Sequence, residues 1–259
     1  MGARTAQRTR TASPEMSVGT LDRAASLNRW RHRALGEKAL IGLGFLALAV
    51  TLPPWPGAAL VSLAMLGFTF PGARVPWRLW LATVALPLGF LAAGAVLLLV
   101  QVGGDGIGLA LGGTERAALL CLRAMAATFC LMFLAFTTPA AELIGGLRRL
   151  WVPAEIVELA LLTYRFVFII ADEAMAMTAA QRARQGHSTR SGWLRSTAMV
   201  IANLLPRAMA RARRMETGLA ARGWQGELRV LSQRNPVSLG MVALVLILQA
   251  AILLAGTLL

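Results

Sequence analysis

Charged residues are scarce in this sequence, and that scarcity sets the first limit on what the protein can be. Only 15% of the 259 residues are charged, whereas about 25% is usual in soluble domains. Hydrophobic residues make up 57% of the chain, and the mean hydropathy is +0.63. These values indicate an all-α integral membrane protein and argue against a soluble enzyme.

Residues that bind metals or nucleotides are also few. The two histidines, His32 and His187, are isolated, and neither they nor the two cysteines form a cluster with ligand spacing. Cys121 and Cys130 are nine positions apart on one predicted helix, so at ~100° per residue they point to opposite faces and cannot bridge. No GxxxxGK[ST] motif occurs. The sequence therefore predicts no catalytic residue, no metal site and no cofactor in this chain.

Acidic residues are outnumbered, with 12 Asp and Glu against 26 Lys and Arg, and Lys38 is the single lysine. Such a balance indicates nucleic-acid binding in a soluble chain, but in membrane proteins cationic residues gather in cytoplasmic loops. The predicted outer segments 53–57 and 103–114 contain no Lys or Arg, whereas 1–38 contains eight and 139–235 contains fourteen. We therefore expect a cytoplasmic N-terminus, an outside C-terminus and no nucleic-acid partner.

Apolar stretches predict about five transmembrane helices, at 39–52, 58–70, 79–102, 117–138 and 237–258. The first two are separated by Pro53-Pro54-Trp55-Pro56, which breaks a stretch too long for one span of ~20 residues. The predicted organisation is a basic cytoplasmic segment 1–38, four transmembrane helices in 39–138, a cytoplasmic or interfacial region 139–235, and a C-terminal transmembrane helix in 236–259.

The region 139–235 predicts a short helix at 140–150 and two long amphipathic helices at 153–184 and 192–222. A sixth span at 153–171 is the alternative, but it would place the eleven arginines between 182 and 234 outside. We therefore expect both long helices at the inner face. Because 159–170 is apolar on nearly every side, it should pack against other helices. The candidate contacts with a membrane partner are Leu159, Leu162, Tyr164, Phe166 and Phe168.

Both long helices end in an alanine-arginine step close to a glycine, in AAQRARQG at 179–186 and in LAARG at 219–223. One interpretation is ordinary capping, since cations and glycine are favoured at helix C-termini. The other is functional: a guanidinium at a helix tip can bind carboxylates bidentately in a partner's groove. Two such tips would fit two copies of one soluble partner.

Arginines within apolar surroundings allow further interpretations. Arg123 lies inside a predicted span, where it can reach the outer interface or pair with Glu115. Arg165 has Glu158 seven positions before it and Asp172 seven after it, which predicts an internal ion pair. On the second long helix, arginines at 207, 211 and 214 line one side, and attraction to anionic lipid is one explanation of them.

Four stretches of the chain resemble the transmembrane T component of energy-coupling-factor (ECF) transporters, of the cobalt-type CbiQ family. They are LDRAASLNRWRHRALGEKAL, TTPAAELIGGLRRLWVPAEIVELALLTYRFVFIIADEA, and the two alanine-arginine-glycine elements. The resemblance covers most of the chain after about residue 21. The first element departs from the family pattern, because Gln185 separates Arg184 from Gly186.

The resemblance implies a non-catalytic scaffold in the bacterial inner membrane. It would join a substrate-binding membrane S component, for cobalt or nickel, to a dimer of ABC-type ATPases that bind ATP and Mg²⁺. The ATPase contacts that it implies are Ala183, Arg184 and Gly186 at one helix end, and Ala221, Arg222 and Gly223 at the other. The alternatives are a self-contained permease or channel lined by Arg123 and Arg165, and a membrane-anchored basic protein.

Overall fold

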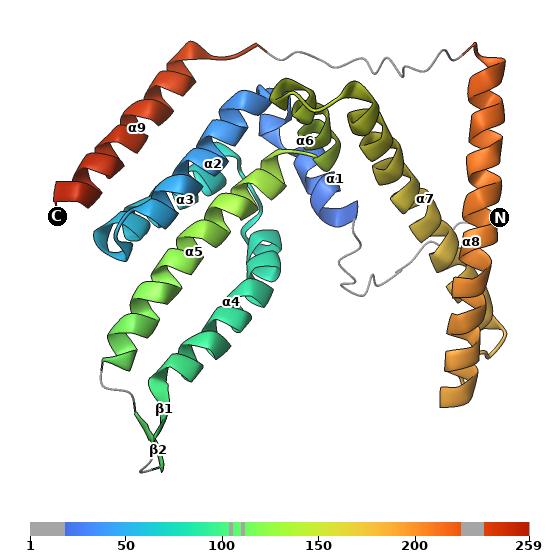
Figure 1. The fold of residues 1–259 in the computed structure, drawn as a ribbon, viewed down its shortest axis with the longest axis horizontal. Coiled ribbons are helices and arrows are strands. Elements are labelled where there is room, and N and C mark those ends of the chain that lie inside the picture. The colour runs from blue at the N-terminus through green and yellow to red at the C-terminus, as the bar shows by residue number, and fades with distance from the viewer. Residues whose placement is uncertain (1–18, 104–105, 110–111, 224–235, 259) are drawn as a thin grey trace, which may run out of the picture.

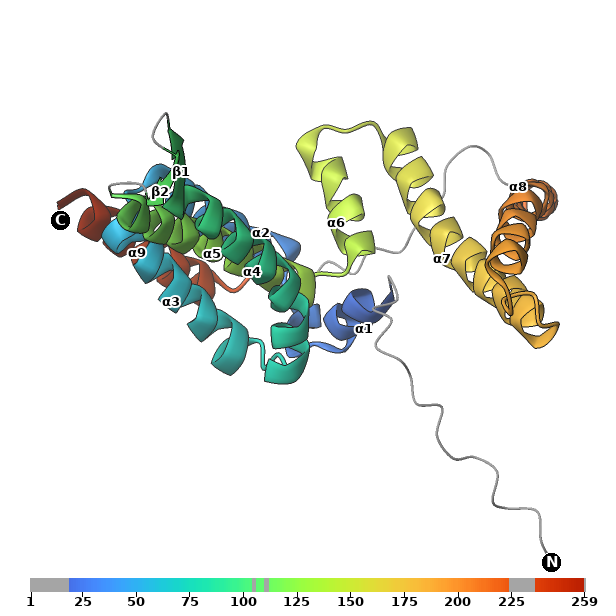
Figure 2. The same cartoon turned by 90° about the horizontal axis from the view of Figure 1, so that it is seen from below.

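The computed structural model describes residues 19–103, 106–109, 112–223 and 236–258, and their fold is dominated by helices (Figure 1). The Arg-rich first eighteen residues and the segment 224–235, which the sequence places inside the cell, lie outside the described residues. The described chain has two parts. A helical bundle holds the apolar stretches, and a long helical hairpin stands beside one end of it (Figures 1 and 2).

The bundle consists of α2 (Leu35–Thr51), α3 (Ala59–Gly67), α4 (Trp77–Leu99), α5 (Gly113–Thr137) and α9 (Leu239–Leu258). Helix α5 is central and packs against α2, α3 and α4, while α9 packs on α2. Aromatic rings fill the core: the rings of Phe45 and Phe133 both contact Phe68, with centroids 5.9 and 6.4 Å from it. All five predicted apolar helices are therefore present and pack together.

Within the described residues, four helical stretches are long and apolar enough to cross a membrane, namely Pro54–Gly72, Trp77–Leu99, Gly113–Thr137 and Leu239–Leu258. The first combines α3 with the flanking turns η2 (Pro54–Ala58) and η3 (Phe68–Gly72). Helix α2 has 17 residues, or ~26 Å at 1.5 Å per residue, which is shorter than the ~30 Å hydrocarbon core. The chain is thus a multi-pass membrane protein, whose terminal orientation stays a prediction.

Helix α4 is the least covered of these stretches. Only 11% of its most apolar window is buried, and Leu86 and Phe90 are 77% and 81% exposed. Large apolar side chains in such numbers are stable only against lipid or another protein chain.

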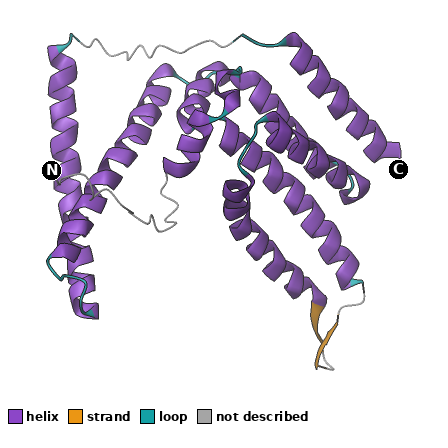
Figure 3. Ribbon diagram, turned by 180° about the vertical axis from the view of Figure 1, so that it is seen from behind, coloured by secondary structure: helices purple, strands orange, loops and turns teal. Residues whose placement is uncertain are grey.

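Between α4 and α5 the structure differs from the loop that the sequence predicts. Strands β1 (Val100–Gly103) and β2 (Gly106–Leu109) pair antiparallel, with Val100 opposite Leu109, at the tip of the bundle (Figure 3). The GGDGIG sequence does not predict this hairpin, because glycine-rich segments have low strand propensity and form strands only when they pair.

The hairpin of long helices follows α5. Helix α6 (Ala140–Gly146) and η4 (Leu147–Leu150) lead to Trp151, which has a left-handed φ of 63°, and Pro153 then precedes α7 (Ala154–Ala183). Helix α8 (Arg190–Ala221) runs back along α7 and continues through Pro206. The predicted bounds 153–184 and 192–222 are confirmed to within two residues. We call α6, α7 and α8 together the arm.

Candidate functional site: the arm and its anchor

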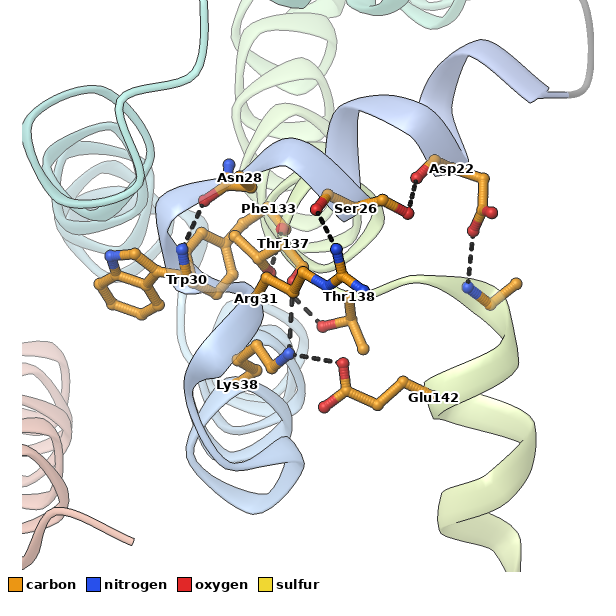
Figure 4. A network of polar contacts seen from close by, with 11 residues as sticks. Asp22, Ser26, Asn28, Trp30, Arg31, Lys38, Phe133, Thr137, Thr138 and Glu142 are labelled. Atoms are coloured by element: carbon orange, nitrogen blue, oxygen red, sulfur yellow. Dashed lines mark hydrogen bonds and ion pairs between the residues drawn. The ribbon is translucent and has the colours of Figure 1, made fainter. Parts of the chain in front are cut away.

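The arm is anchored to the bundle by a network of polar contacts near the start of α2 and the end of α5 (Figure 4). Lys38 of α2 is fully buried, and its Nζ donates to Glu142 Oε2 of α6 at 2.8 Å and to the Thr137 carbonyl at 3.3 Å. Thr137 is the last residue of α5, where helix carbonyls have no partner within the helix. The lysine therefore holds the end of α5 and the start of α6 together.

Asp22 forms a second connection from α1 (Gly19–Leu27), which packs on α5. Its Oδ1 accepts a hydrogen bond from the Ala140 backbone N–H at 3.1 Å, at the first residue of α6. Carboxylates are favoured at this position because helix N-termini carry unpaired donors and partial positive charge. Pro139, which precedes Ala140, cannot donate a hydrogen bond and fixes the direction in which α6 leaves the bundle.

The same carboxylate reaches the arm further along, at Tyr164 of α7. Burial, together with hydrogen bonding to Asp22 and the charge of that carboxylate, raises the pKa of Tyr164 to about 12. Tyr164 is the only tyrosine in the chain and packs edge-to-face on Phe168, with ring centroids 4.9 Å apart. Asp22 thus connects α1 to the start of α6 and lies close enough to Tyr164 of α7 to affect its ionisation.

Trp30 completes the anchor from η1 (Arg29–His32). Its indole Nε1–H donates to the Gly72 carbonyl at 2.9 Å, and its ring packs edge-to-face on Phe133 of α5. Asn28 caps the turn by accepting from the Trp30 backbone N–H at 2.9 Å. The two longest stretches that carry the family resemblance, at residues 21–40 and 137–174, are therefore in direct contact.

Within the arm, α7 and α8 contact each other near the closed end of the hairpin. Glu173 of α7 and Arg207 of α8 form an ion pair at 2.6 Å, and the Ser196 hydroxyl donates to the Gly186 carbonyl at 3.0 Å. Beyond this contact the two helices diverge toward the N-terminal end of α7 and the C-terminal end of α8 (Figure 1). The described arm contacts the bundle mainly through α6.

The end of α7 is a complete Schellman cap. The Gly186 N–H donates to the Gln181 carbonyl at 2.9 Å, and the Gln185 N–H donates to Arg182 at 3.1 Å. The left-handed position, which glycine favours, is taken here by Gln185, whose φ is 62°. Gly186 is required for another reason: a Cβ there would lie 2.4 Å from Ser196 Oγ.

The end of α8 follows the expected pattern. Gly223 has a left-handed φ of 70°, and its N–H donates to the Ala220 carbonyl at 3.0 Å. Arg222 occupies the C-cap position, as Arg184 does at the end of α7, and both side chains are exposed. The two elements are thus equivalent helix ends, although different residues supply the left-handed conformation.

The two helix ends lie far apart. Arg184 precedes the turn into α8 and Arg222 follows its last residue, so they are separated by roughly the length of this 32-residue helix, ~48 Å at 1.5 Å per residue. A small domain is ~30 Å across. One such domain could not contact both ends at once, whereas a dimer could.

The five candidate partner contacts on α7 do not share one face. Leu162 and Phe166 line the space between α7 and α8, and Leu159 follows on the same side at three-residue spacing with 65% exposure. Tyr164 and Phe168 lie on the other side of the helix, toward α1. The apolar residues of α7 therefore lie on two different faces of the helix, one toward α8 and one toward α1.

The arginines in apolar surroundings have contacts that the sequence did not predict. The ion pair that the structure shows on Glu158 joins it to Arg148 of η4 at 2.7 Å. The pairing of Arg165 with Glu158 or Asp172 stays a prediction. Arg123 donates to the Leu52 carbonyl at 2.7 Å, at the end of α2 where Pro53 ends the helix. Arg123 thus connects α5 to this break.

Sequence reasoning missed the anchor residues Asp22, Lys38 and Glu142. One signal was available, because Lys38 is the only lysine in the chain and directly precedes an apolar run. For metals, the described residues contain no group of three or more His, Cys, Asp or Glu side chains that could hold an ion.

The fold and the site define a multi-pass membrane protein with a long helical arm anchored to its bundle. Comparison with known proteins gives its family: the Cobalt transport protein family, CbiQ, matches residues 27–233. The chain is 67% identical over 244 residues to the Cobalt transport protein CbiQ of Rhodobacter capsulatus, covering 94% of this chain and 100% of that protein. It is 31% identical to the CbiQ protein of Salmonella typhimurium, over 81% of this chain and 99% of the relative.

The chain therefore belongs to the CbiQ family and is a membrane component of cobalt transport. A further relative, in Methanocorpusculum labreanum, is named a putative fused cobalt transport protein CbiMQ. It is 27% identical over 84% of this chain, which covers 38% of that longer protein.

Proposed function

We propose that this chain is the energy-coupling T component of an ECF-type cobalt importer. In this role the arm transmits movement from a dimer of ABC-type ATPases to a membrane S component that binds the metal. ATP and Mg²⁺ bind to the ATPases, and the chain itself needs no cofactor. The observation that carries the proposal is the pair of equivalent helix ends, each with an exposed arginine, about one helix length apart.

The proposed ATPase contacts are Ala183, Arg184 and Gly186 on α7, and Ala221, Arg222 and Gly223 on α8. An arginine at a helix C-cap is held by the backbone and presents a planar fork to carboxylates. The small alanines beside each arginine let a partner surface approach closely. The fused relative supports a partnership of this chain with a second cobalt transport component.

The anchor gives the arm a route for transmitting movement. A force on α7 or α8 passes through α6 to α2, α5 and α1, because Lys38, Glu142 and Asp22 connect these elements. The uncovered face of α4, with Leu86 and Phe90, offers apolar surface for lipid or the S component. A permease lined by Arg123 is less well supported, because its guanidinium is bonded to the Leu52 carbonyl.

The test is co-purification from the native membrane in mild detergent. We expect ATPase subunits to accompany the tagged wild-type chain and to be lost from the Arg184→Glu plus Arg222→Glu variant. The matched control is Arg195→Glu plus Arg213→Glu, which makes the same charge change at two exposed arginines away from the helix ends. Equal ATPase recovery from both double variants would contradict the assigned contacts, and cobalt uptake by the lone chain in liposomes would favour a permease.

A further inference from the structure

The diverging halves of α7 and α8 enclose a groove of about 630 Å³. This volume lies within the ~300–1,000 Å³ that is usual for small-molecule sites. Its apolar lining comes from both helices and comprises Leu161, Leu162, Phe166, Ile169, Met215 and Leu219. The groove opens beyond the contact between Glu173 and Arg207, so the helices are joined at one end of it and separate at the other.

Four arginines line the same groove. Arg165 comes from α7, Arg211 and Arg214 come from α8, and Arg222 is the C-cap residue of α8. The single carboxylate among the lining residues is Glu158, which already accepts a hydrogen bond from Arg148 at 2.7 Å. Four guanidinium groups around an apolar surface repel one another, and one anionic group between them would relieve that repulsion with charge-assisted hydrogen bonds.

We propose that this groove binds an anionic phospholipid. The phosphate would lie between Arg211 and Arg214, which are three positions apart on the face of α8 that meets α7. One acyl chain would follow Leu162 and Phe166. This assignment rests on the proposed function, because that function places the arm at the inner face of the membrane, where anionic lipids attract arginine.

Charge and shape together favour a lipid over other occupants. A free phosphate or nucleotide would leave the apolar lining exposed to water, and a neutral lipid would leave the arginines unneutralised. A phospholipid with a net negative headgroup would neutralise the arginines with its phosphate and cover the apolar lining with its acyl chain. It would also fill the space between α7 and α8, so that the arm moves as one body rather than as two separate helices.

The experiment uses the purified full-length chain in detergent, with native mass spectrometry as the readout. The probes are dioleoyl phosphatidylglycerol and dioleoyl phosphatidylcholine, which share acyl chains and differ in net charge. The test variant is Arg211→Gln plus Arg214→Gln. The control is Arg195→Gln plus Arg213→Gln, which removes the same charge from positions about 200° around α8 from Arg211.

We expect the wild-type chain and the control to retain phosphatidylglycerol in preference to phosphatidylcholine. In the test variant that preference should fall by about thirtyfold, from the loss of two arginine–phosphate contacts. An equal loss in the control would mean diffuse attraction to the basic surface, and equal retention of the two lipids by the wild-type chain would mean no anionic site. Either result overturns the proposal.

The lipid proposal and the ATPase proposal can be refuted independently of each other. Arg184 and Arg222 are unchanged in the lipid experiment, so ATPase co-purification can persist when lipid binding is lost. If phosphatidylglycerol does not bind but ATPase recovery depends on Arg211 and Arg214, the groove is an ATPase contact and the lipid proposal is wrong. Size-exclusion elution and helical circular dichroism identify a variant that has merely lost its fold.

Discussion

Lys38→Met is the substitution that tests the anchor most sharply. It keeps most of the side-chain volume but removes the cation that contacts Glu142 Oε2 at 2.8 Å and the Thr137 carbonyl at 3.3 Å. Removing one partner of a buried pair costs about 3–5 kcal/mol. Because Glu142 is 28% exposed and keeps some contact with water, we expect the lower value, about 3 kcal/mol.

Thermal unfolding in detergent, followed by tryptophan fluorescence, provides the measurement. At ~2–4 °C per kcal/mol, the midpoint should fall by about 6–12 °C. Arg207→Met is the control, because its pair with Glu173 has a similar distance of 2.6 Å but side chains that are 54% and 34% exposed. An exposed pair contributes below about 1 kcal/mol.

A double-mutant cycle separates pairing from packing. Lys38→Met combined with Glu142→Leu removes both charges, so the destabilisation should be smaller than the sum of the two single effects. Strict additivity would refute the reasoning. So would a Lys38→Met midpoint that falls no further than that of Arg207→Met.

Three further predictions concern the arm. Gly186→Ala should lower the midpoint by several degrees, because its Cβ would meet Ser196 Oγ at 2.4 Å; an unchanged midpoint would contradict the cap geometry. Gln185→Gly should stabilise the chain by about 0.5–1 kcal/mol by relieving a positive φ of 62°, and a lower midpoint would contradict this. Tyr164 should ionise near pH 12 when followed by absorbance at 295 nm, and Asp22→Asn should lower that pKa. Burial and Asp22 favour the neutral phenol in the folded chain. The stabilisation that Tyr164 contributes is therefore complete below about pH 10 and is lost as the pH rises toward 12.

The long helices could be predicted from the sequence because their signals are local. Pro153 directly precedes α7, the Ala-Arg elements end α7 and α8, and the apolar stretches between charges define the bundle. The absence of Lys and Arg from segments 53–57 and 103–114 is read directly along the chain in the same way, and their location outside the membrane stays a prediction.

The anchor could not be predicted in this way because its partners are distant in sequence. Lys38 and Glu142 are 104 positions apart and Asp22 and Ala140 are 118 apart, so no spacing rule connects them. The groove between α7 and α8 could not be predicted either, because its shape depends on the direction in which α8 returns along α7. Gln185 shows a local limit as well, because the residue in the left-handed position was not the glycine that propensity favours.

Site-specific crosslinking in the intact complex tests the central claim most directly. A photoreactive amino acid would replace Arg184 or Arg222 at the helix ends, and Arg195 or Arg213 as controls on the side of α8. Coupling through the helix ends predicts crosslinks from positions 184 and 222 to ATP-hydrolysing subunits, and none from 195 or 213. Crosslinks to those subunits from the control positions alone, or from none of the four, would contradict it.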